Sequence, residues 1–342
     1  MIVLIGTKDT KRTEYFIKAA RDLNVPVQFV DWNMVYQGSG LQNLLCHCAD
    51  SQRAVIKLEP PSYQTAEFSQ METQLRMYTH ALEGIAGKFS FLNSPQGILD
   101  ALDKRKMKGI LRAAGVSVTP VFMERVDSAE QLYARMDEEN VSAIFLKPVC
   151  FSGAAGVVAI RRQRRSGKMA AYTSGVLEKA RVINTKKIHM MREEKRITKL
   201  IEALIPMDVM AEKWIPKDTV DGKSYDLRVV WQFGKRKHMV VRQSASPITN
   251  LHLNNQAVDG AVIGLDGDTC EEIDALCECA MEVVPGLRVA GIDILLEKGS
   301  RKPRIIEING QGDLIYKDIF EENEIYKEQI QWMLREEAIG GK

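Results

Sequence analysis

The 342-residue chain has few cysteines, no long apolar run and almost no net charge, and each deficit excludes a class of protein. Its six cysteines form no C-x-x-C pair, so we expect reduced, mostly buried thiols and no structural zinc site. No apolar stretch approaches the roughly 20 residues that cross a bilayer, and the apolar start is too short for a signal-peptide core. We therefore expect a cytoplasmic protein without membrane contact.

Two common phosphate-binding loops are also missing. Only Gly6 follows the first apolar stretch, Ile2–Ile5, without the G-x-G-x-x-G of a dinucleotide site, and no G-K-[ST] ending marks a Walker A loop. The net charge of +2 selects no class of partner by itself. Internal repeats and low-complexity segments are absent as well.

The order of apolar and helical segments predicts the fold class. Short apolar runs at 2–5, 27–30 and 54–58 alternate with helical patterns, which is typical of a parallel α/β sheet. Pro95 and Gly97 mark a boundary, and the pattern becomes strand-rich after Leu204. We expect three parts: an α/β domain at 1–92, then two α+β subdomains at 93–207 and 208–342. Helices are predicted at 11–23, 66–84, 98–114, 128–138 with Ser128 as N-cap, 186–204, from near Thr269, and at 315–338.

Two apolar strands near the C-terminus carry regularly placed polar side chains. The stretch Arg304–Asn309 puts Glu307 and Asn309 on one face, because side chains of a strand alternate. The polar segment before it fits a hairpin turn, and a turn centred on Ser300 places Asp293 opposite Glu307. Three oxygen donors without His or Cys suit Mg²⁺ and a phosphate-bearing ligand. The alternative is a solvated polar face, but the acids lie among isoleucines and leucines.

A second segment has the composition of a phosphate-binding hairpin. The strand ending at Lys147 and Pro148 is followed by the small-residue loop Ser152–Gly156 and another strand. Small residues let backbone N–H groups approach phosphate oxygens. Lys104, on the helix that begins near Pro95, could reach the same place. The plain alternative is a hairpin without a ligand.

The stretch Met210–Pro216 runs from a strand into a loop and contains Glu212, Lys213, Trp214 and Ile215. Main-chain groups at such a strand end can bind an adenine edge, and Asp218 could bind ribose hydroxyls. The same pattern also fits an edge strand leaving its sheet.

A basic segment lies between these motifs. Residues 161–199 contain 13 Lys or Arg against three acids. A solvated charged surface is the default interpretation, and an electropositive lip for an acidic peptide, a phosphorylated substrate or RNA is the functional one. Only one aromatic residue, Tyr172, interrupts the run, so binding of nucleic acid by base stacking is not supported.

Taken in order, these motifs resemble the ATP-grasp superfamily of ATP-dependent carboxylate–amine ligases. The resemblance covers about residues 90–320, and the N-terminal α/β unit fits the domain that usually precedes the grasp. The motifs that carry it are Asn93, Asp103-Lys104, Lys147-Pro148, Ser152–Gly156, Glu212–Ile215, Asp226-x-Arg228, Arg242, Gly291-Ile292-Asp293 and Glu307-x-Asn309.

The resemblance implies a role for each motif. ATP would lie between the two subdomains, its phosphates on Lys104 and Lys147 and under the loop with Ser152, Gly153 and Gly156. The segment Glu212–Ile215 would hold adenine, and Asp218 ribose. Asp293, Glu307 and Asn309 would hold one or two Mg²⁺ ions, with Mn²⁺ as an alternative. Arg242 would lie near the γ-phosphate, with Arg228 in support; for both arginines a salt bridge is the alternative.

The implied reaction is transfer of the γ-phosphoryl group to a substrate carboxylate, giving an acylphosphate and ADP, followed by attack of an amine or another nucleophile. The motifs look most similar to ribosomal-protein glutamate ligases and peptide-modifying grasp ligases. The chain departs from the usual pattern at 249–255 and at Gly310–Asp313, where substrate would bind, so the identities of the acid and the amine do not carry over. A kinase of the same fold, a nucleotide-binding regulatory module and a homo-oligomer stay open.

Overall fold

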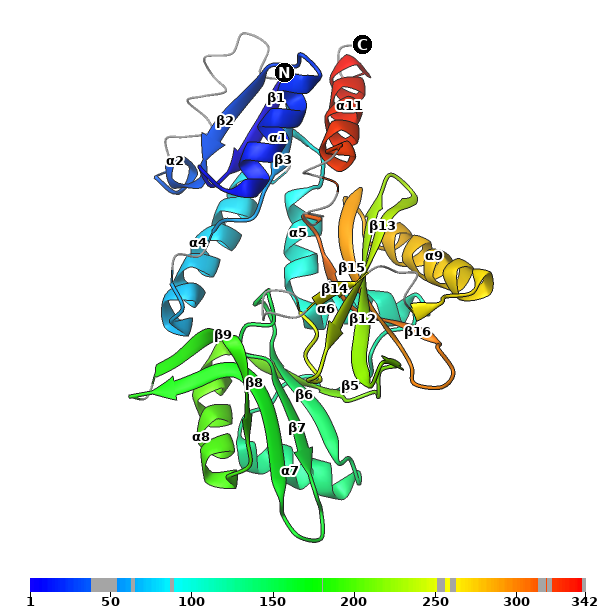
Figure 1. Ribbon diagram of the computed structural model, residues 1–342. Helices are drawn as coiled ribbons and strands as arrows, with labels where there is room; N and C mark the ends of the chain where they lie inside the picture. Colours follow the sequence, from blue (N-terminus) through cyan, green and yellow to red (C-terminus); the bar gives the residue numbers. More distant parts are fainter. Residues whose placement is uncertain are drawn as a thin grey trace.

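The computed structural model describes residues 1–37, 54–62, 65–86, 89–179, 181–250, 256–258, 263–312, 318 and 322–339. The strands named there form three sheets, which we call sheets A, B and C in chain order (Figure 1). Mixed helix and sheet with a parallel N-terminal sheet is the fold class that the sequence predicts. Cys46, Cys48 and Asp313 lie outside the described residues.

Sheet A is parallel, with strand order β2-β1-β3-β4. Its elements are β1 (Ile2–Gly6), α1 (Lys11–Asp22), β2 (Val27–Asp31), α2 (Trp32–Tyr36), β3 (Val55–Leu58), α4 (Phe68–Ile85) and β4 (Ser90–Phe91). Ile2 and Leu4 pack with α1 and with the C-terminal helix α11 (Glu324–Ile339), whereas Val3 and Ile5 pack with α4 on the other face. Helices thus cover both faces, as expected of a parallel sheet.

The expectation of one helix at Ile98–Ala114 is wrong. Two helices, α5 (Pro95–Leu102) and α6 (Lys104–Ala113), meet at Asp103. The Asp103 backbone is extended, and its carboxylate accepts from the N–H of Lys106 at 2.9 Å, so Asp103 ends one helix and caps the next. Lys104 therefore occupies the first position of α6.

Sheet B is antiparallel, with strand order β5-β10-β6-β7-β8-β9. Its elements are β5 (Val121–Met123), α7 (Ala129–Glu138), β6 (Ala143–Pro148), β7 (Val158–Arg162), β8 (Met169–Glu178), β9 (Arg181–Met191), α8 (Glu194–Leu204), the 3₁₀ turn Ile205–Met207 and β10 (Val209–Lys213). Ile144 and Leu146 pack against α7 and α8. Phe145 and Lys147 consequently face the other side of the sheet.

The helix expected at Lys186–Leu204 is only half right. Residues up to Met191 continue β9, which pairs with β8, and the helix begins at Glu194. The lysines and apolar residues of this segment fit both the helical and the strand period. Its pairing with β8 makes it a strand. The Ser128 cap of α7 is confirmed, because its hydroxyl accepts from the N–H of Gln131 at 3.0 Å.

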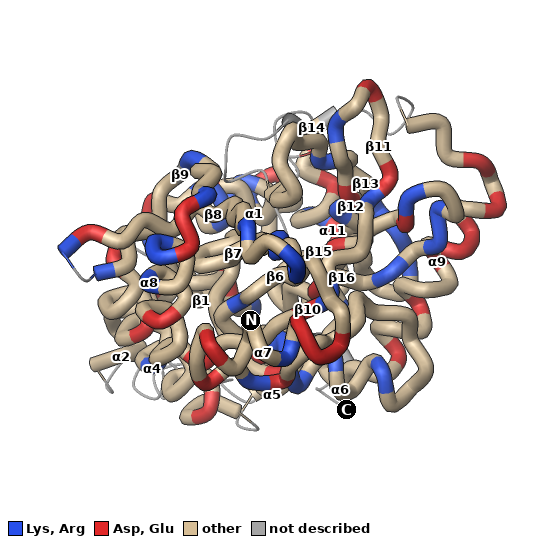
Figure 2. The backbone as a smooth tube through the Cα atoms, turned by 90° about the horizontal axis from the view of Figure 1, so that it is seen from below, with Lys and Arg blue, Asp and Glu red and all other residues tan. Residues whose placement is uncertain are grey.

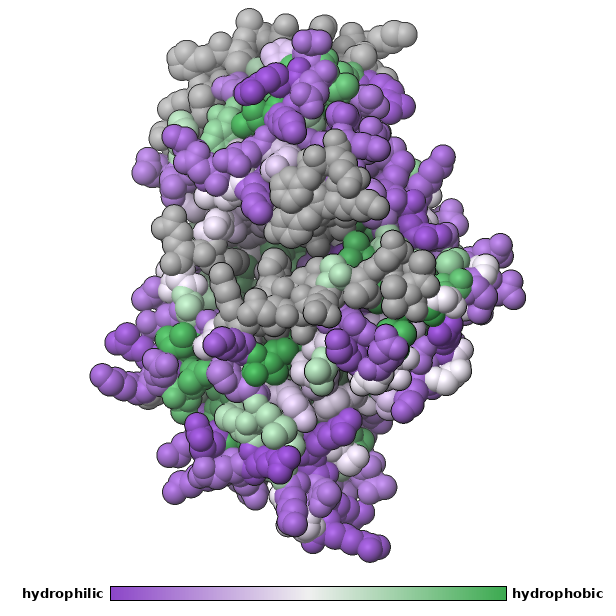
Figure 3. Space-filling view, viewed as in Figure 1, coloured by the Kyte–Doolittle hydropathy of each residue, from purple (hydrophilic) through white to green (hydrophobic). Residues whose placement is uncertain are grey.

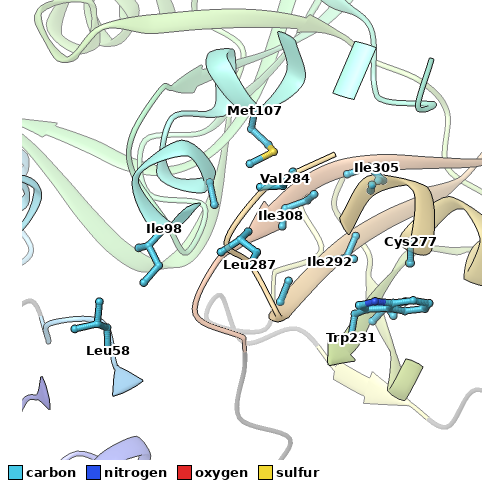
Figure 4. Packing of buried hydrophobic residues seen from close by; sticks show 14 of the residues in the cluster. Leu58, Ile98, Met107, Trp231, Cys277, Val284, Leu287, Ile292, Ile305 and Ile308 are labelled. Atoms are coloured by element: carbon cyan, nitrogen blue, oxygen red, sulfur yellow. The ribbon is translucent and has the colours of Figure 1, made fainter. Parts of the chain in front are cut away.

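Sheet C is antiparallel, with strand order β14-β13-β12-β15-β16, and β11 pairs with β12. Its elements are β11 (Thr219–Val220), β12 (Lys223–Gln232), β13 (Lys235–Ser244), β14 (Gln256–Val258), α9 (Gly267–Glu282), β15 (Val289–Leu296) and β16 (Pro303–Asn309). Asp266 caps α9 by accepting from the N–H of Thr269 at 2.7 Å. Figure 4 shows Ile292 and Ile308 of sheet C packed with Met107 of α6 and with Leu287. This face of sheet C is therefore covered by apolar side chains.

The cysteines and the surface agree with most of what composition predicts. The described cysteines are free thiols. Cys277 is buried, and Cys150 and Cys270 are half-buried. Cys279 is exposed, so the expectation that the thiols are buried is wrong for Cys279. The face shown in Figure 3 is largely hydrophilic, with apolar patches mainly over sheet B. In the part of the chain that the structure covers, no helix combines the length and apolarity of a bilayer span.

Candidate active site

Two adjoining pockets lie at the junction of the sheets. The first, of about 750 Å³, lies between sheets B and C; the second, of about 1260 Å³, extends toward sheet A. Both are lined by Lys104, Phe151, Asn250 and Glu307, so the pockets meet at these four residues. Of the residues proposed from sequence, the first pocket is also lined by Lys147, Glu212, Lys213, Ile215, Arg242 and Asp293. The second is also lined by Ser152, Gly153, Arg228 and Asn309.

The predicted pairing of the two acidic strands is confirmed. Asp293 of β15 lies opposite Glu307 of β16, and Gly291 lies opposite Asn309. Arg228 of β12 lies beside Asp293 on the same face of sheet C. The other face of these strands carries Ile292, Ile305 and Ile308 in the core. The register shifts between Asp293 and Ile294, so Ile306 is an extra residue and lines the first pocket beside Glu307. Alternation together with this irregularity turns the charged side chains toward the pockets.

Asp293 is buried between two arginines. Its carboxylate lies 2.6 Å from Nε of Arg228 and 3.1 Å from Nη2 of Arg242. A Cβ on Gly291 would come within 2.5 Å of Nη1 of Arg228, so a side chain there would displace this guanidinium from its present position. Burial raises the pKa of Asp293 to about 6, although both arginines oppose the shift.

Glu307 has the opposite electrostatic setting. Burial alone would raise its pKa. The positive charges of Lys104 and Lys147, and to a smaller extent those of the two arginines, lower this pKa to about 2. Its carboxylate is 3.9 Å from Nζ of Lys104. Glu307 is therefore ionised over the whole physiological range, at the point where the two pockets meet.

The donor set fits a hard divalent cation. Asp293 and Glu307 supply carboxylate oxygens, and Asn309 donates its amide N–H to the carbonyl oxygen of Gly291 at 3.2 Å, which leaves the amide oxygen for a cation. Among the described residues, no group of three or more His, Cys, Asp and Glu side chains could hold a metal ion. The set proposed here contains only two such side chains, Asp293 and Glu307, and its third member is the amide of Asn309. Mg²⁺ matches such a set, because it is commonly held by one or two carboxylates together with phosphate oxygens.

Lys104, the first residue of α6, lies where the two pockets meet. Its ammonium donates to the carbonyl oxygens of Val149, at 3.5 Å, and of Phe151. Both carbonyls belong to the segment after β6, so the start of α6 and that segment are held together. The lysine thereby presents its charge beside Glu307 with little freedom to move.

The loop Ser152–Gly156 joins β6 to β7, as the sequence predicts for a hairpin tip. Gly153, Ala154 and Gly156 all have positive φ. A Cβ on Gly156 would meet Pro148 at 2.7 Å and Phe68 at 2.9 Å, so this glycine is required by close packing. Ser152 and Gly153 line the second pocket, whereas Gly156 lines neither pocket and packs against Pro148 and Phe68.

Glu212 is the centre of a buried polar cluster. Its carboxylate accepts from Nζ of Lys147 at 2.8 Å and from the hydroxyl of Thr119 at 2.7 Å, and it lies 3.3 Å from Nζ of Lys108. Burial would raise its pKa, but the two lysines lower it overall. Glu212 thus fixes the position of Lys147, which lines the first pocket. Because the carboxylate of Glu212 is engaged by these residues, adenine binding by residues 212–215 would depend on their main-chain groups.

Two residues assigned to the nucleotide lie elsewhere. Trp214 packs on Phe145, with ring centroids 5.1 Å apart, and under the guanidinium of Arg161 at 4.3 Å. Asp218 accepts from the hydroxyl of Tyr225 and from Nε of Arg301, both at 2.9 Å. Neither is among the residues that line the first pocket.

The pocket contains charged residues to which the sequence interpretation gave no role. Lys217 donates to Asp226 at 2.9 Å and to Thr249 at 2.7 Å, and Asp226 also accepts from Nε of Arg242 at 2.7 Å. Lys217 follows Pro216 in a loop, where no periodicity shows its direction. Lys108 lines neither pocket but contacts Glu212, and it carried a signal in the sequence, since it lies four residues after Lys104 on the same helix face.

The basic segment spans three strands and a helix. Figure 2 marks Lys and Arg residues along β8, β9 and α8, at the edge of sheet B. Arg164, Arg165 and Lys168 lie exposed in the turn between β7 and β8. The surface is accordingly separate from the residues that line the two pockets.

Solved structures share this fold, although the sequence matches no protein-family model and no curated protein. The D-cycloserine synthetase DcsG has a TM-score of 0.62 at 13% identity, covering 98% of this chain and 100% of DcsG. The macrocyclase MdnC from Microcystis aeruginosa MRC, bound with precursor peptide MdnA, has a TM-score of 0.60 at 14% identity, covering 98% and 100%. The ATP-grasp ligase PsnB, complexed with a phosphomimetic variant of minimal precursor, Mg and ADP, has a TM-score of 0.55 at 14% identity, covering 98% and 97%.

The fold and the two pockets therefore define the class of protein: an α/β domain followed by two sheets with pockets at their junction. More specifically, the chain has the ATP-grasp fold over nearly its whole length, as the resemblance in sequence implies.

Proposed function

We propose that this protein is an ATP-dependent, ADP-forming ligase that activates a carboxylate of an amino acid or peptide as an acylphosphate and joins it to an amine. The supporting observation is the pairing of Asp293 with Glu307 at the junction of two pockets, with Lys104 and Arg242 beside them. One pocket would hold ATP and the other the acid, so the γ-phosphate and the carboxylate would meet at Glu307.

The chain's residues would act by positioning and by neutralising charge. Lys104 and Lys147 would bind phosphate oxygens, and the N–H groups of the Ser152–Gly156 loop would cover them. Arg242 and Arg228 would bind the oxygens of the reacting carboxylate and of the transferred phosphoryl group. Asp293, Glu307 and Asn309 would hold Mg²⁺, one ion or two, which would supply further neutralisation of phosphate charge; Mn²⁺ could replace it.

The bonds balance without a further reagent. A carboxylate oxygen attacks the γ-phosphorus, and the bond to ADP breaks. The amine nitrogen then attacks the acyl carbon, and inorganic phosphate leaves as the amide forms. No side chain need become covalently attached, which agrees with a site made of lysines, arginines and carboxylates.

The substrate is proposed to include a peptide. MdnC and PsnB are described with precursor peptides, and both share this fold over nearly the whole chain. The basic surface at residues 161–199 could hold an acidic part of such a peptide, away from the pockets.

ADP release over a panel of carboxylic acids and peptides, each with and without an amine, tests the proposal. A ligase releases ADP with acid and amine together, and the product mass equals their sum less one water. A product that gains one phosphate and persists in the presence of amines would identify a kinase instead.

The metal assignment has its own test. Glu307→Gln and Asn309→Ala should each lower Mg²⁺-dependent ADP release by on the order of 100-fold, because each removes an oxygen ligand or its charge. Glu297→Gln neutralises a half-buried carboxylate of the same hairpin that pairs with Arg304 and lines neither pocket, and it is the matched control. Full turnover in both pocket variants would overturn the assignment.

A further inference from the structure

Arg242 reaches the centre of the first pocket by crossing a strand. It belongs to β13, yet its Nη2 lies 3.1 Å from the carboxylate of Asp293 on β15. In sheet C, β12 lies between these two strands, so the side chain of Arg242 extends over β12. A side chain of this length has many rotamers, and binding a phosphoryl group at one fixed point needs a single one of them. The extended form therefore needs a partner along its path.

Asp226 provides that partner on β12. It lies opposite Arg242 in the pairing of β12 with β13, and its Oδ1 accepts from Nε of Arg242 at 2.7 Å. Asp226 is 2% exposed and Arg242 4% exposed. Nε precedes the guanidinium fork, so a bond to Nε sets the direction of the fork and leaves both Nη atoms to other partners. Among the residues that the structure describes, Nη1 of Arg242 has no acceptor.

The second oxygen of Asp226 is held as firmly as the first. Its Oδ2 accepts from Nζ of Lys217 at 2.9 Å and from the hydroxyl of Thr249. Lys217 also donates to Thr249 at 2.7 Å, which closes a triangle of contacts. Burial would raise the pKa of Asp226, but Arg242 and Lys217 lower it overall, so the carboxylate is ionised. Asp226 consequently offers Arg242 a charged acceptor that does not rotate.

Asp226 is suited to act through Arg242 and not on the nucleotide itself. Three donors already occupy its two oxygens, and its negative charge would repel a phosphate. Arg242, in contrast, presents a fork that can bind two oxygens of one phosphoryl group. That binding depends on the direction of the fork, which the bond to Asp226 sets.

We propose that Asp226, held by Lys217 and Thr249, is a positioning residue that orients Arg242 toward the γ-phosphate. This inference rests on the proposed ATP-dependent function and adds to it the residue that directs the guanidinium. A pair that served stability alone would affect ATP and ADP equally. A positioning residue affects only the nucleotide that carries the γ-phosphate.

The preference for a triphosphate tests the inference. Calorimetric titration in the presence of Mg²⁺ gives the Kd of ADP and the Kd of the non-hydrolysable analogue AMP-PNP. Their ratio is insensitive to a loss of folded protein, because such a loss affects both nucleotides alike. The wild-type ratio should be roughly tenfold to 100-fold, the usual contribution of hydrogen bonds to a charged group. Arg242→Gln should remove most of that preference.

Asp226 is removed together with Lys217, because a lysine left alone in the interior would endanger folding. Asp226→Ala combined with Lys217→Met should lose as much preference as Arg242→Gln does, and adding Arg242→Gln should cause no further loss. Lys217→Met alone keeps the bond from Arg242 to Asp226 and should retain most of the preference. Asp274→Ala is the matched control, because Asp274 pairs in the same way with Arg236 of β13 and lines neither pocket. Its ratio should equal that of the wild type.

The outcomes separate the inference from the proposed function. The inference is overturned if Asp226→Ala with Lys217→Met keeps the ratio of Lys217→Met alone, or if adding Arg242→Gln lowers the ratio further. A wild-type ratio in Arg242→Gln also overturns it. ADP release reports the ligase separately: if no acid drives it, the ligase proposal fails, and a ratio lost with Asp226 still supports the positioning role. Absence of nucleotide binding in the wild type overturns both.

Discussion

A single buried amide, Asn93, connects three parts of the chain. Its Nδ2 donates to the carbonyl oxygens of Val289, at 2.7 Å, and Gly310, at 2.6 Å. Its Oδ1 accepts from the N–H groups of Arg288, at 2.7 Å, and Val289, at 3.0 Å. Two donors and two acceptors are satisfied at once, which only a carboxamide can do at this position.

Asn93→Asp should therefore destabilise the protein more than Asn93→Ala does. Aspartate keeps the acceptor but turns two donors into a buried charge facing carbonyl oxygens, whereas alanine leaves four backbone groups unpaired. We expect a loss of on the order of 2–4 kcal/mol in the free energy of unfolding for alanine, and a larger loss for aspartate. Urea unfolding measures both, and the exposed Asn24→Asp is the control. Equal effects of aspartate and alanine would contradict this view.

Lys108 gives the stability of the protein a dependence on alkaline pH. Burial lowers its pKa to about 8, although Glu212 opposes the shift. Between about pH 8 and the usual lysine pKa near 10.5, the unfolded chain holds a proton that the folded one has lost. The contribution of Lys108 to stability therefore rises with pH in this window, by at most about 1.4 kcal/mol per unit.

Lys108→Met should remove that part of the slope when urea unfolding is repeated between pH 8 and pH 10. Thr119 and Lys147 still satisfy Glu212 in this variant. Lys168→Met removes one charge from the exposed β7–β8 turn and controls for net charge. A slope identical to that of the wild type would mean that Lys108 titrates alike in both states.

At this scale, sequence reasoning succeeds where a strand fixes the direction of a side chain. Glu307, Asn309 and Asp293 could be placed together from a two-residue period and a hairpin, although no sequence pattern showed the extra residue, Ile306, that shifts the register next to Asp293. Asp218 and Lys217 are neighbours in a loop, so no period shows that Lys217 lines the pocket while Asp218 pairs with Tyr225 and Arg301. The contact of Arg12 with the carbonyl oxygen of Gln311 could not be predicted for another reason, since 299 positions separate the two residues.

Among the elements, α5 depends on a tight contact at its beginning. Ser94 caps the helix by accepting from the N–H of Gly97 at 3.0 Å, and its own N–H donates to the carbonyl oxygen of Gly286 at 2.8 Å. Gly286 has a φ of +85°, and a Cβ there would lie 2.0 Å from Oγ of Ser94. The turn before β15 and the cap of α5 thus exclude any side chain.

Gly286→Ala should cost about 3 kcal/mol or more in the free energy of unfolding. The cost combines a left-handed backbone with displacement of the Ser94 cap. Gly299→Ala is the matched control, because Gly299 has a φ of +89° but open space around its Cα. Its cost should stay near 1–2 kcal/mol, and the difference between the two variants, measured by urea unfolding, reports the contact with Ser94. Equal costs would show that backbone strain alone matters.

Most elements were predictable because their periods are clear. The helix expected from residue 315 begins only at Glu324, after Asn323 with its φ of +54°. Two other errors share one cause. Residues 98–114 read as one helix because both sides of Asp103 have helical spacing, and the break depends on one capping carboxylate. Residues 186–191 read as helix because the strand that they extend pairs with β8, far from any local signal. In both places the deciding interaction is invisible to a local pattern.

For the whole molecule, the pockets between sheets predict that ATP stabilises the fold only together with Mg²⁺. A ligand at 100 times its Kd adds about 2.7 kcal/mol to the free energy of unfolding. We expect a clear rise in Tm with ATP and Mg²⁺ in a thermal melt, and its loss when EDTA removes the metal. Glu307→Gln should show no such rise in Tm with or without EDTA. A full rise in EDTA would show that nucleotide binding does not need the metal.

The predicted division at 1–92, 93–207 and 208–342 remains a proposal, and the hydrogen bonding adds one detail. β10 follows Met207 in the chain yet belongs to sheet B, between β5 and β6. The change from sheet B to sheet C therefore falls after Lys213, and the sequence could not reveal it because β10 has the same apolar pattern as the strands of either sheet.

The insertion of β10 between two earlier strands has a consequence for synthesis on the ribosome. When the nascent chain has delivered β5 through β9, the place between β5 and β6 is still vacant. Both strands then present unpaired edges until Lys213 emerges from the exit tunnel, and β1 is covered later still by α11, which begins only at Glu324. Termination between the end of β6 and Lys213 would thus leave both strands with an exposed edge open to aggregation, and pairing with β10 covers these two edges.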